Sequence, residues 1–289
     1  MTADDDVVDT HVHIWDPSHR GLEWLSEPTW SGIRRPFGLS ELSAMLDLVG
    51  IGSAVLVNAT TDNSENERLL AAVGHRRVLG VVGWVPLADP RVAAQRLDVL
   101  SAEAAFTGVR YMAGHEPEPD LLDDGSVVDL APLAERGLLL EVMPRRLADV
   151  HAIARLAGRN PGTRIVIDHL AKPLSAPSTH DWDAAMSATA RQPNVLVKIS
   201  GWTTPVRPGW SARDIRPYVE RAVELFGAER LMYASNWPVT LIAGSYEQVW
   251  HETNEALRSC SGPERKAIFA GTAHAVYDPR ARVTQGGPA

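Results

Sequence analysis

The stretch Val7-Val8-Asp9-Thr10-His11-Val12-His13 (VVDTHVH) joins a short β-branched apolar run to two histidines. Seven later stretches repeat this pattern: GSAVLVN from Gly52, VLGVVGWV from Val78, FTGVRYM from Phe106, LLLEVMP from Leu138, RIVIDHL from Arg164, VLVKISG from Val195 and LMYASN from Leu231. Such continuous apolar runs are typical of strands that are covered on both faces of a parallel sheet. The sequence therefore predicts eight parallel strands.

The segments between these runs have helical periodicity. Four of them are expected to form helices: Asn63 to about Arg76, a segment that begins near Pro90, Ala148–Arg159, and Asp214–Phe226 with Gly227 as its C-terminal stop. Alternation of strand and helix, repeated eight times, favours an α/β fold of the (β/α)8 TIM-barrel type. A doubly wound open sheet is the alternative, but no glycine-rich phosphate-binding loop follows any of the eight runs.

A single domain is expected. Residues 6–280 would form the barrel, with Gly262–Tyr277 as an extra C-terminal helix and residues 1–5 and 281–289 as loose termini. The 28 Lys and Arg against 36 Asp and Glu give a net charge of −8, and no Lys/Arg run exceeds two residues, so nucleic acid is not an expected partner. No apolar run reaches the roughly 18 residues of a membrane span, and the acidic start differs from a signal peptide. A cytoplasmic protein is the default expectation.

Catalytic groups of a TIM barrel gather at the C-terminal ends of its strands. This rule selects candidates from six of the eight runs: His11 and His13, Arg110 and Tyr111, Glu141, Asp168, His169 and Lys172, Lys198 and Ser200, and Asn236 and Trp237. The two-residue period of a strand places Asp9, His11 and His13 on one face, and Asp9 and Asp168 are expected to accept hydrogen bonds from neighbouring imidazoles. With His169, the two histidines of the first run form a tentative metal-ligand set for a divalent ion such as zinc, which needs one more ligand.

Six motifs carry a resemblance to a known family: VDTHVHIWDP (8–17), VVGWVPL (81–87), GVRY (108–111), DHLAKP (168–173), VKISG (197–201) and RLMYASNWPV (230–239). Together they resemble the amidohydrolase superfamily, in its amidohydrolase-2 branch of L-fuconolactonase-like and pyrone-dicarboxylate-lactonase-like enzymes. The resemblance implies a TIM-barrel hydrolase that opens the ring ester of a small lactone, either a sugar aldonolactone of carbohydrate metabolism or a carboxylated lactone. It implies catalytic roles for His11, His13, Arg110, His169 and Asn236.

Two residues depart from the family pattern. Asn236 stands where the family usually has an aspartate that activates water, and Tyr111 stands where a histidine is common. An amide cannot accept a proton near neutral pH. His13 or His169 would then serve as the base, because an imidazole has an ordinary pKa of about 6.5, and an ionisation near neutrality is expected in the pH–rate profile. Whether Asn236 is natural or engineered is left open.

The remaining candidates concern substrate binding. The fork of donors on Arg110 suits a carboxylate or a lactone oxygen. Lys172 could polarise the carbonyl or cap a helix, and Lys198, inside an apolar strand, is expected to pair with a carboxylate. Three indoles follow strand ends: Trp15, Trp202 and Trp237. They could form apolar walls that contact the substrate, or they could pack at the rim of the barrel.

Three functions follow as expectations. The first is a lactonase acting on a small-molecule lactone or carboxylate. The second is a metal-dependent decarboxylase or other lyase of the same superfamily, and the third is a binding barrel that lost catalysis when Asn236 replaced the carboxylate. Both a centre with one divalent metal and a metal-independent one are compatible with these residues, and the sequence does not fix the oligomeric state.

Overall fold

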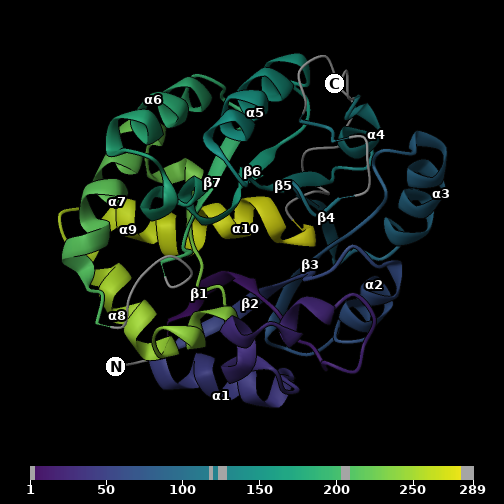
Figure 1. The fold of residues 1–289 in the computed structure, drawn as a ribbon, viewed down its shortest axis with the longest axis horizontal. Coiled ribbons are helices and arrows are strands. Elements are labelled where there is room, and N and C mark those ends of the chain that lie inside the picture. The colour runs from purple at the N-terminus through teal and green to yellow at the C-terminus, as the bar shows by residue number, and fades with distance from the viewer. Residues whose placement is uncertain (1–3, 117–119, 123–128, 203–208, 281–289) are drawn as a thin grey trace.

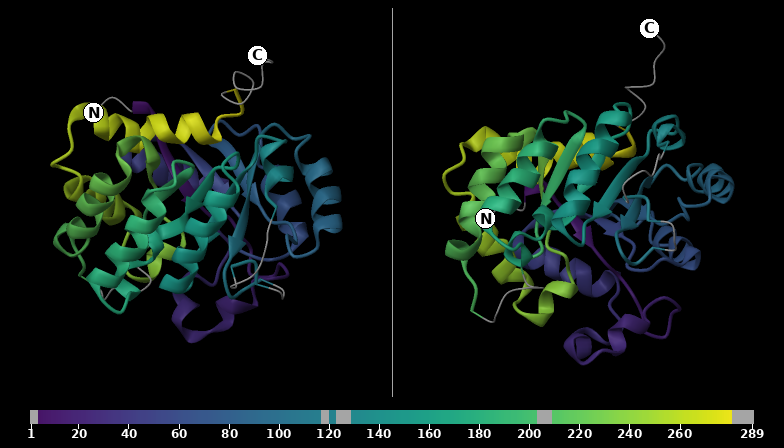
Figure 2. Two further views of the ribbon diagram at one scale, coloured as in Figure 1. Left: turned by 90° about the horizontal axis from the view of Figure 1, so that it is seen from above. Right: turned by 45° about the horizontal axis from the view of Figure 1, so that its top comes forward.

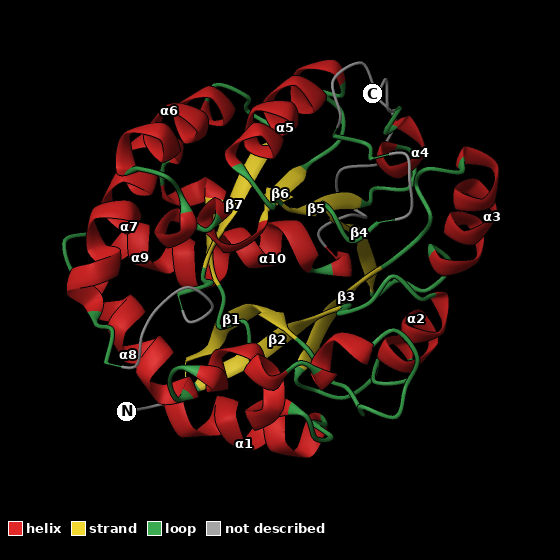
Figure 3. Cartoon of the chain, in the orientation of Figure 1, coloured by secondary structure: helices red, strands yellow, loops and turns green. Residues whose placement is uncertain are grey.

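The computed structural model of the chain describes residues 4–116, 120–122, 129–202 and 209–280. In these ranges eight strands pair in parallel and follow one another around one sheet in sequence order (Figure 3). They are β1 (Asp4–Val12), β2 (Ile51–Val57), β3 (Val78–Gly83), β4 (Phe106–Met112), β5 (Leu139–Met143), β6 (Ile165–Ile167), β7 (Val195–Ile199) and β8 (Leu231–Tyr233).

The sheet closes on itself just beyond the end of β8. The backbone N–H of His13 donates to the carbonyl of Trp237 at 2.7 Å, and the N–H of Asn236 donates to the carbonyl of His11 at 2.9 Å. Val12 and Trp237 form a parallel bridge between these two bonds. The eight strands form a nearly closed ring, which confirms the predicted TIM barrel and places Asn236 beside the first strand.

Helices surround the ring of strands (Figure 1). In the described ranges they are α1 (Leu39–Val49), α2 (Asn63–Leu70), α3 (Pro90–Leu100), α4 (Ala131–Ala134), α5 (Leu147–Arg159), α6 (Thr179–Ala190), α7 (Ala212–Phe226), α8 (Tyr246–Ala256), α9 (Gly262–Lys266) and α10 (Thr272–Tyr277). The four helices expected from periodicity correspond to α2, α3, α5 and α7. Side chains of Asp62 and Asp89 accept backbone N–H groups at the starts of α2 and α3, which fixes where these helices begin. However, α2 ends at Leu70, earlier than predicted, where a turn begins.

Apolar side chains form two separate layers. The larger layer lies between the sheet and the helices and includes Val109, Val142 and Val197. The smaller layer fills the interior of the barrel with Val8, Val55, Val57, Val82, Leu139, Val166, Leu196 and Met232. Alternation along each strand separates the two layers.

The C-terminal helical segment closes one end of the barrel. Three side chains of α10, namely Ala273, Val276 and Tyr277, join the interior layer. Arg164, just before β6, donates to the carbonyl of Ala275, so α10 lies at the end where the strands begin. Figure 2 (left) shows this yellow segment and the purple loop that follows β1 at opposite ends of the molecule. The extra helix is therefore part of the core, and the opposite end, where the strands finish, is the open one.

The described N-terminus differs from expectation. β1 already begins at Asp4, within the segment that was expected to be loose, while residues 1–3 and 281–289 lie outside the described part of the chain. None of the helices in the described ranges is both long and apolar enough to cross a membrane.

Candidate active site

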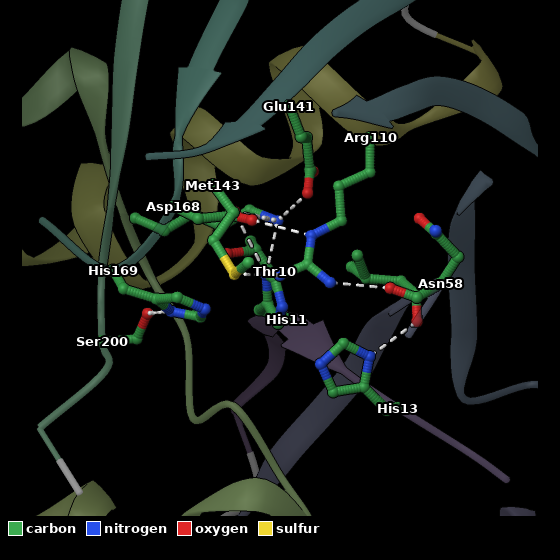
Figure 4. Close-up of polar contacts among 12 residues, drawn as sticks. Thr10, His11, His13, Asn58, Arg110, Glu141, Met143, Asp168, His169 and Ser200 are labelled. Atoms are coloured by element: carbon green, nitrogen blue, oxygen red, sulfur yellow. Dashed lines mark hydrogen bonds and ion pairs between the residues drawn. The ribbon is translucent and has the colours of Figure 1, made fainter. Parts of the chain in front are cut away.

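Side chains from the ends of β1, β4 and β6 meet at the open end of the barrel (Figure 4). The ring centroid of His11 lies 4.8 Å from that of His13 and 4.7 Å from that of His169. Arg110 and Asp168 lie beside these rings, and all five side chains are buried. The structure thus brings together the histidines and the arginine that the strand-end rule selected, with Asn236 bonded to the His11 backbone.

Asp168 lies between two cations, Arg110 and Lys198, and the imidazole of His11. Its Oδ2 accepts Arg110 Nε at 2.9 Å, while Oδ1 lies 3.3 Å from His11 Nδ1 and 3.7 Å from Lys198 Nζ. Burial opposes ionisation, but His11, Arg110 and Lys198 together hold the pKa of Asp168 well below its ordinary value. Asp168 is therefore a carboxylate at neutral pH, and its Oδ1 lies beside the imidazole of His11 without receiving a hydrogen bond from the described residues.

His13 has a defined tautomer. Its Nδ1 lies 2.8 Å from the carbonyl oxygen of Val57, and a carbonyl only accepts, so Nδ1 carries the proton and Nε2 carries the lone pair. Burial, followed by the charge of Arg110, lowers the pKa of His13 to about 3. The side chain of Asn236 is its next polar neighbour. His13 is thus a neutral imidazole with a proton-accepting nitrogen beside Asn236.

His169 lies on an unusual turn. Four consecutive residues from His169 to Lys172 have φ between 49° and 58°, the left-handed region. The turn is closed by the N–H of Lys172, which donates to the carbonyl of His169 at 2.7 Å. His169 Nδ1 lies 2.8 Å from Ser200 Oγ, and burial lowers the pKa of the ring to about 3. The turn directs His169 toward the ring of His11.

Lys198 forms the ion pair that the sequence predicted. Its Nζ lies 2.6 Å from Glu141 Oε2, and both side chains are fully buried. Burial raises the pKa of Glu141, an effect that Lys198 opposes. Lys198 also approaches His11 Nδ1 at 3.2 Å. Glu141 also accepts the hydroxyl of Tyr277 from α10, so this pair lies toward the end of the barrel that α10 closes.

Arg110 is held by two strong acceptors. Besides Asp168, its Nη1 donates to the carbonyl of Asn58 at 2.7 Å, and its Nη2 contacts the Met143 sulfur, a weak acceptor, at 3.5 Å. The guanidinium therefore keeps Nη2 available for a substrate oxygen. Lys172 is half-buried at the same mouth, where burial and then the Arg110 charge lower its pKa.

Tyr111 does not contribute to this site, contrary to expectation. Its hydroxyl donates to Asp120 at 2.5 Å and accepts the N–H of Leu121 at 2.9 Å, and its ring belongs to the layer between sheet and helices. Because side chains alternate along β4, Arg110 faces inward and Tyr111 faces outward. Tyr111 instead anchors the loop that follows β4.

The three predicted indole walls are packed in the core. Trp202 and Trp237 are 1% and 0% exposed, and Trp202 Nε1 donates to Thr253 of α8. Trp15 stacks on His13 with centroids 5.9 Å apart, but it is 5% exposed and packs edge-on against Trp24. The structure favours the packing interpretation for all three indoles.

Asp9 also corrects an expectation. Its Oδ1 accepts the backbone N–H of Ser235 at 2.9 Å, and its Oδ2 accepts the hydroxyl of Tyr246, which lies on α8 outside the sheet. The pairing of β1 with β2 shifts register between Asp9 and Val12, so Asp9 does not share the inward face of His11. Its carboxylate reaches the backbone N–H of His11, not an imidazole.

His11, Asp168 and His169 have the residue types of a divalent-metal site, with one ligand atom from each lying within 4.8 Å of the others. His13, the third histidine of the predicted set, is not in this group. Both carboxylate oxygens of Asp168 already face cations, Arg110 Nε and Lys198 Nζ. A divalent ion on Asp168 would meet these two fixed positive charges in a buried environment, which opposes its binding there.

Several site residues escaped the sequence analysis. Asn58 directly follows β2 and would have been found by the same strand-end rule. Tyr277 of α10, whose hydroxyl donates to Glu141, carried no sequence signal, since it lies in a terminal helix far from any strand end. Glu116, which accepts Trp84 Nε1 and the N–H of Met112 at 2.8 Å each, lies in a loop.

Comparisons with known proteins identify the family and the fold. The sequence profile of the Amidohydro_2 family, described as amidohydrolase, matches residues 8–278. An L-fucono-1,5-lactonase of Burkholderia ambifaria is 32% identical over 93% of this chain and 94% of its own, and one of Burkholderia multivorans is 29% identical over 93% and 95%. A crystal structure of an amidohydrolase from Burkholderia multivorans with bound zinc superposes with a TM-score of 0.79 and 28% identity, covering 94% of this chain and 98% of that one.

Proposed function

This chain belongs to the amidohydrolase family, and we propose that it is a lactonase, which opens the ring ester of a small sugar lactone to the hydroxy acid. The observation that carries the proposal is the group of three neutral imidazoles beside the Arg110 guanidinium at the mouth of the barrel. Full-length similarity to L-fucono-1,5-lactonases supports a sugar lactone as the substrate class. Such a substrate would give the enzyme a role in carbohydrate metabolism.

Binding of the lactone would use the cationic side of the mouth. Arg110 Nη2 and the ammonium of Lys172 can both donate to the carbonyl oxygen. Donors that are fixed in place stabilise the negative charge that develops on this oxygen when water attacks. Arg110 is fixed by Asp168 and the carbonyl of Asn58, so little reorganisation is needed during the reaction.

Proton transfer would be carried out by His13. Its Nε2 lone pair takes one proton from the attacking water while the oxygen forms a bond to the carbonyl carbon. The tetrahedral intermediate then collapses, its carbonyl re-forms, and the bond from the acyl carbon to the ring oxygen breaks. The departing alkoxide receives the proton back from His13, and the new carboxylic acid loses its proton to solvent. Asn236, which cannot act as a base, would hold the water by hydrogen bonds.

A panel of 1,5- and 1,4-aldonolactones tests the function, with acid release followed by a pH indicator. Hydrolysis of sugar lactones well above the spontaneous rate is expected. Substitution His13→Gln should lower kcat by roughly 10²–10⁴-fold, the usual contribution of a general base, whereas the control His251→Gln, at an exposed position on α8, should not. Binding of lactones without turnover would support a binding barrel, and release of carbon dioxide from unsaturated acids would support a lyase.

We propose that the reaction needs no metal, because the cations around Asp168 leave no favourable position for a divalent ion. Protein dialysed against a chelator, with metal content measured by elemental analysis, should keep its kcat within about twofold. Loss of activity on chelation, restored by zinc, would contradict this part of the proposal while leaving the lactonase assignment intact.

A further inference from the structure

A line of buried polar side chains runs from α10 through the interior of the barrel to His11. The hydroxyl of Tyr277 donates to Glu141 Oε1, and Glu141 Oε2 lies 2.6 Å from Lys198 Nζ. Lys198 Nζ lies 3.2 Å from His11 Nδ1. All four residues are 0% exposed. Because no solvent reaches these charges, each of them depends on its neighbour in the line for compensation.

The contacts of His11 Nδ1 decide where the ring proton lies. The ammonium of Lys198 can only donate, so Nδ1 is the acceptor of this bond. Asp168 Oδ1 lies 3.3 Å from the same nitrogen, yet in the described part of the chain it receives no hydrogen bond. A ring nitrogen that accepts a hydrogen bond carries no proton, so the ring is neutral. A neutral ring that accepts at Nδ1 carries its proton on Nε2.

His11 Nε2 has no partner of its own. It is a buried atom for which the described residues offer no hydrogen bond. His11 lies between the rings of His13 and His169, next to the place where the lactone would react. An N–H group that is buried without an acceptor in the free protein is satisfied when a ligand supplies an oxygen.

We propose that Tyr277, Glu141 and Lys198 are positioning residues that hold the His11 proton on Nε2, where it donates to a substrate oxygen. The C-terminal helix would thereby take part in catalysis from the closed end of the barrel. The donor role rests on the proposed lactone hydrolysis, since an ester oxygen that gains negative charge is the acceptor that such a donor stabilises. The placement of the proton does not depend on that reaction.

The tautomer is measured directly by NMR of protein labelled with ¹⁵N-histidine. Long-range ¹H–¹⁵N correlations distinguish a protonated ring nitrogen from an unprotonated one, and the spectrum of His11→Gln assigns the signals of His11. We expect the proton on Nε2 and an unprotonated Nδ1. A proton on Nδ1 of His11 would overturn the proposal, whatever the activity of the protein.

Tyr277→Phe removes only the hydroxyl at the far end of the line. We expect the Nδ1-protonated form of His11 to appear, and kcat to fall roughly three- to tenfold, as for the loss of one hydrogen bond, with KM within about twofold. Tyr246→Phe is the matched control, because Tyr246 also donates from a helix to a buried carboxylate, Asp9, at 2.9 Å. This control should leave the His11 spectrum unchanged. An unaltered tautomer and kcat in Tyr277→Phe would contradict the proposal.

Glu141→Gln provides a second variant if Tyr277→Phe does not fold. It keeps the shape of the side chain but removes the charge that faces Lys198, so the same change of tautomer is expected, and an unchanged His11 spectrum would count against the proposal. If the wild-type protein hydrolyses no lactone while the NMR result holds, the proposed function fails and the placement of the proton stands. If lactones are hydrolysed but His11 has the other tautomer, only the positioning proposal fails.

Discussion

Asn236 has a left-handed backbone conformation, and its side chain lies beside the imidazole of His13. Its φ of 62° lies in the left-handed region, which Asn and Asp adopt more readily than other non-glycine residues. The N–H of Thr240 donates to its carbonyl at 3.0 Å, and its own N–H closes the barrel against His11. The backbone therefore accommodates either an amide or a carboxylate here, and the choice between them affects chemistry more than folding.

Restoring a carboxylate with Asn236→Asp should increase lactone turnover. An aspartate beside His13 adds a proton acceptor and stabilises the imidazolium that forms there, so kcat is expected to rise about tenfold or more. Steady-state kinetics of the variant and the wild type on one lactone measure the gain. Unchanged or lower turnover in a variant of equal thermal stability would show that Asn236 is already the better residue for this reaction.

The sequence predicted that His13 or His169 would ionise near neutral pH. That prediction is wrong, because burial lowers the pKa of both rings. Both His13 and His169 have their pKa lowered to about 3, so neither should produce an ionisation between pH 5 and 8. Glu116 is one group whose pKa lies near neutrality, because burial raises it from 4.5 to about 7. Arg110 opposes this shift, and Asp120 adds to it.

Glu116 makes the fold less stable as pH rises. Below pH 4.5 both folded and unfolded chains hold the proton; between 4.5 and 7 only the folded chain does, so the stabilisation is lost through this window. Gln at position 116 cannot ionise, so Glu116→Gln should not lose stability through this window. At pH 8 its free energy of unfolding should exceed that of the wild type by roughly 1–3 kcal/mol. Urea unfolding of both proteins at pH 5 and pH 8 measures these free energies. If the variant and the wild type differ by the same amount at both pH values, Glu116 does not cause the pH dependence.

At the scale of single elements, the turn from His169 to Lys172 is the most costly feature of the site. Left-handed backbone costs roughly 1–2 kcal/mol for each residue other than glycine, and four such residues follow one another here. Trp182 Nε1 holds the turn from α6 by donating to the carbonyl of Leu170 at 2.8 Å. On its other side Gly201 packs against His169, with space for no side chain.

Gly201→Ala should displace His169. An added Cβ would lie 2.4 Å from the Cβ of His169, on a backbone with φ of +82°. We expect kcat/KM to fall at least tenfold and stability to fall by about 1–3 kcal/mol. Gly74→Ala is the control, since Gly74 has φ of +96° but nothing within 4 Å. If both variants lose activity equally, backbone strain, not contact with His169, is the cause.

The local pattern of apolar residues predicted the strands and helices, but it did not predict which way every side chain points. The apolar runs identified all eight strands, and the rule of strand ends found His11, His13, Arg110 and His169, because both depend on features that repeat along the sequence. Asp9 was misplaced because a register shift interrupts the two-residue period, and no residue type signals that shift. The left-handed turn was equally invisible, since it contains no glycine.

At the scale of the whole molecule, the barrel is sealed at one end and reactive at the other. The fold class could be predicted because strand–helix alternation is a property of the complete chain. The position of α10 could not, because its contacts with the interior of the barrel join residues that are more than a hundred positions apart.

A charge placed in the sealed end should destabilise the entire barrel. Ala273 is fully buried against the interior layer, whereas Ala275 on the same helix is exposed. Ala273→Asp is expected to lower the free energy of unfolding by about 3 kcal/mol or more, and Ala275→Asp to change it by less than about 0.5 kcal/mol. Thermal and urea unfolding measure both. Equal, small effects would mean that α10 does not plug the barrel.

The contribution of α10 also sets an order of events during synthesis. A ribosome delivers the strand with His11 first and Tyr277 more than two hundred and sixty residues later. Until residue 277 has emerged, the interior of the barrel is uncovered at the end where the strands begin, and Glu141 lacks its hydrogen bond from the Tyr277 hydroxyl. A nascent chain would thus close this end of its barrel only after all eight strands have been synthesised.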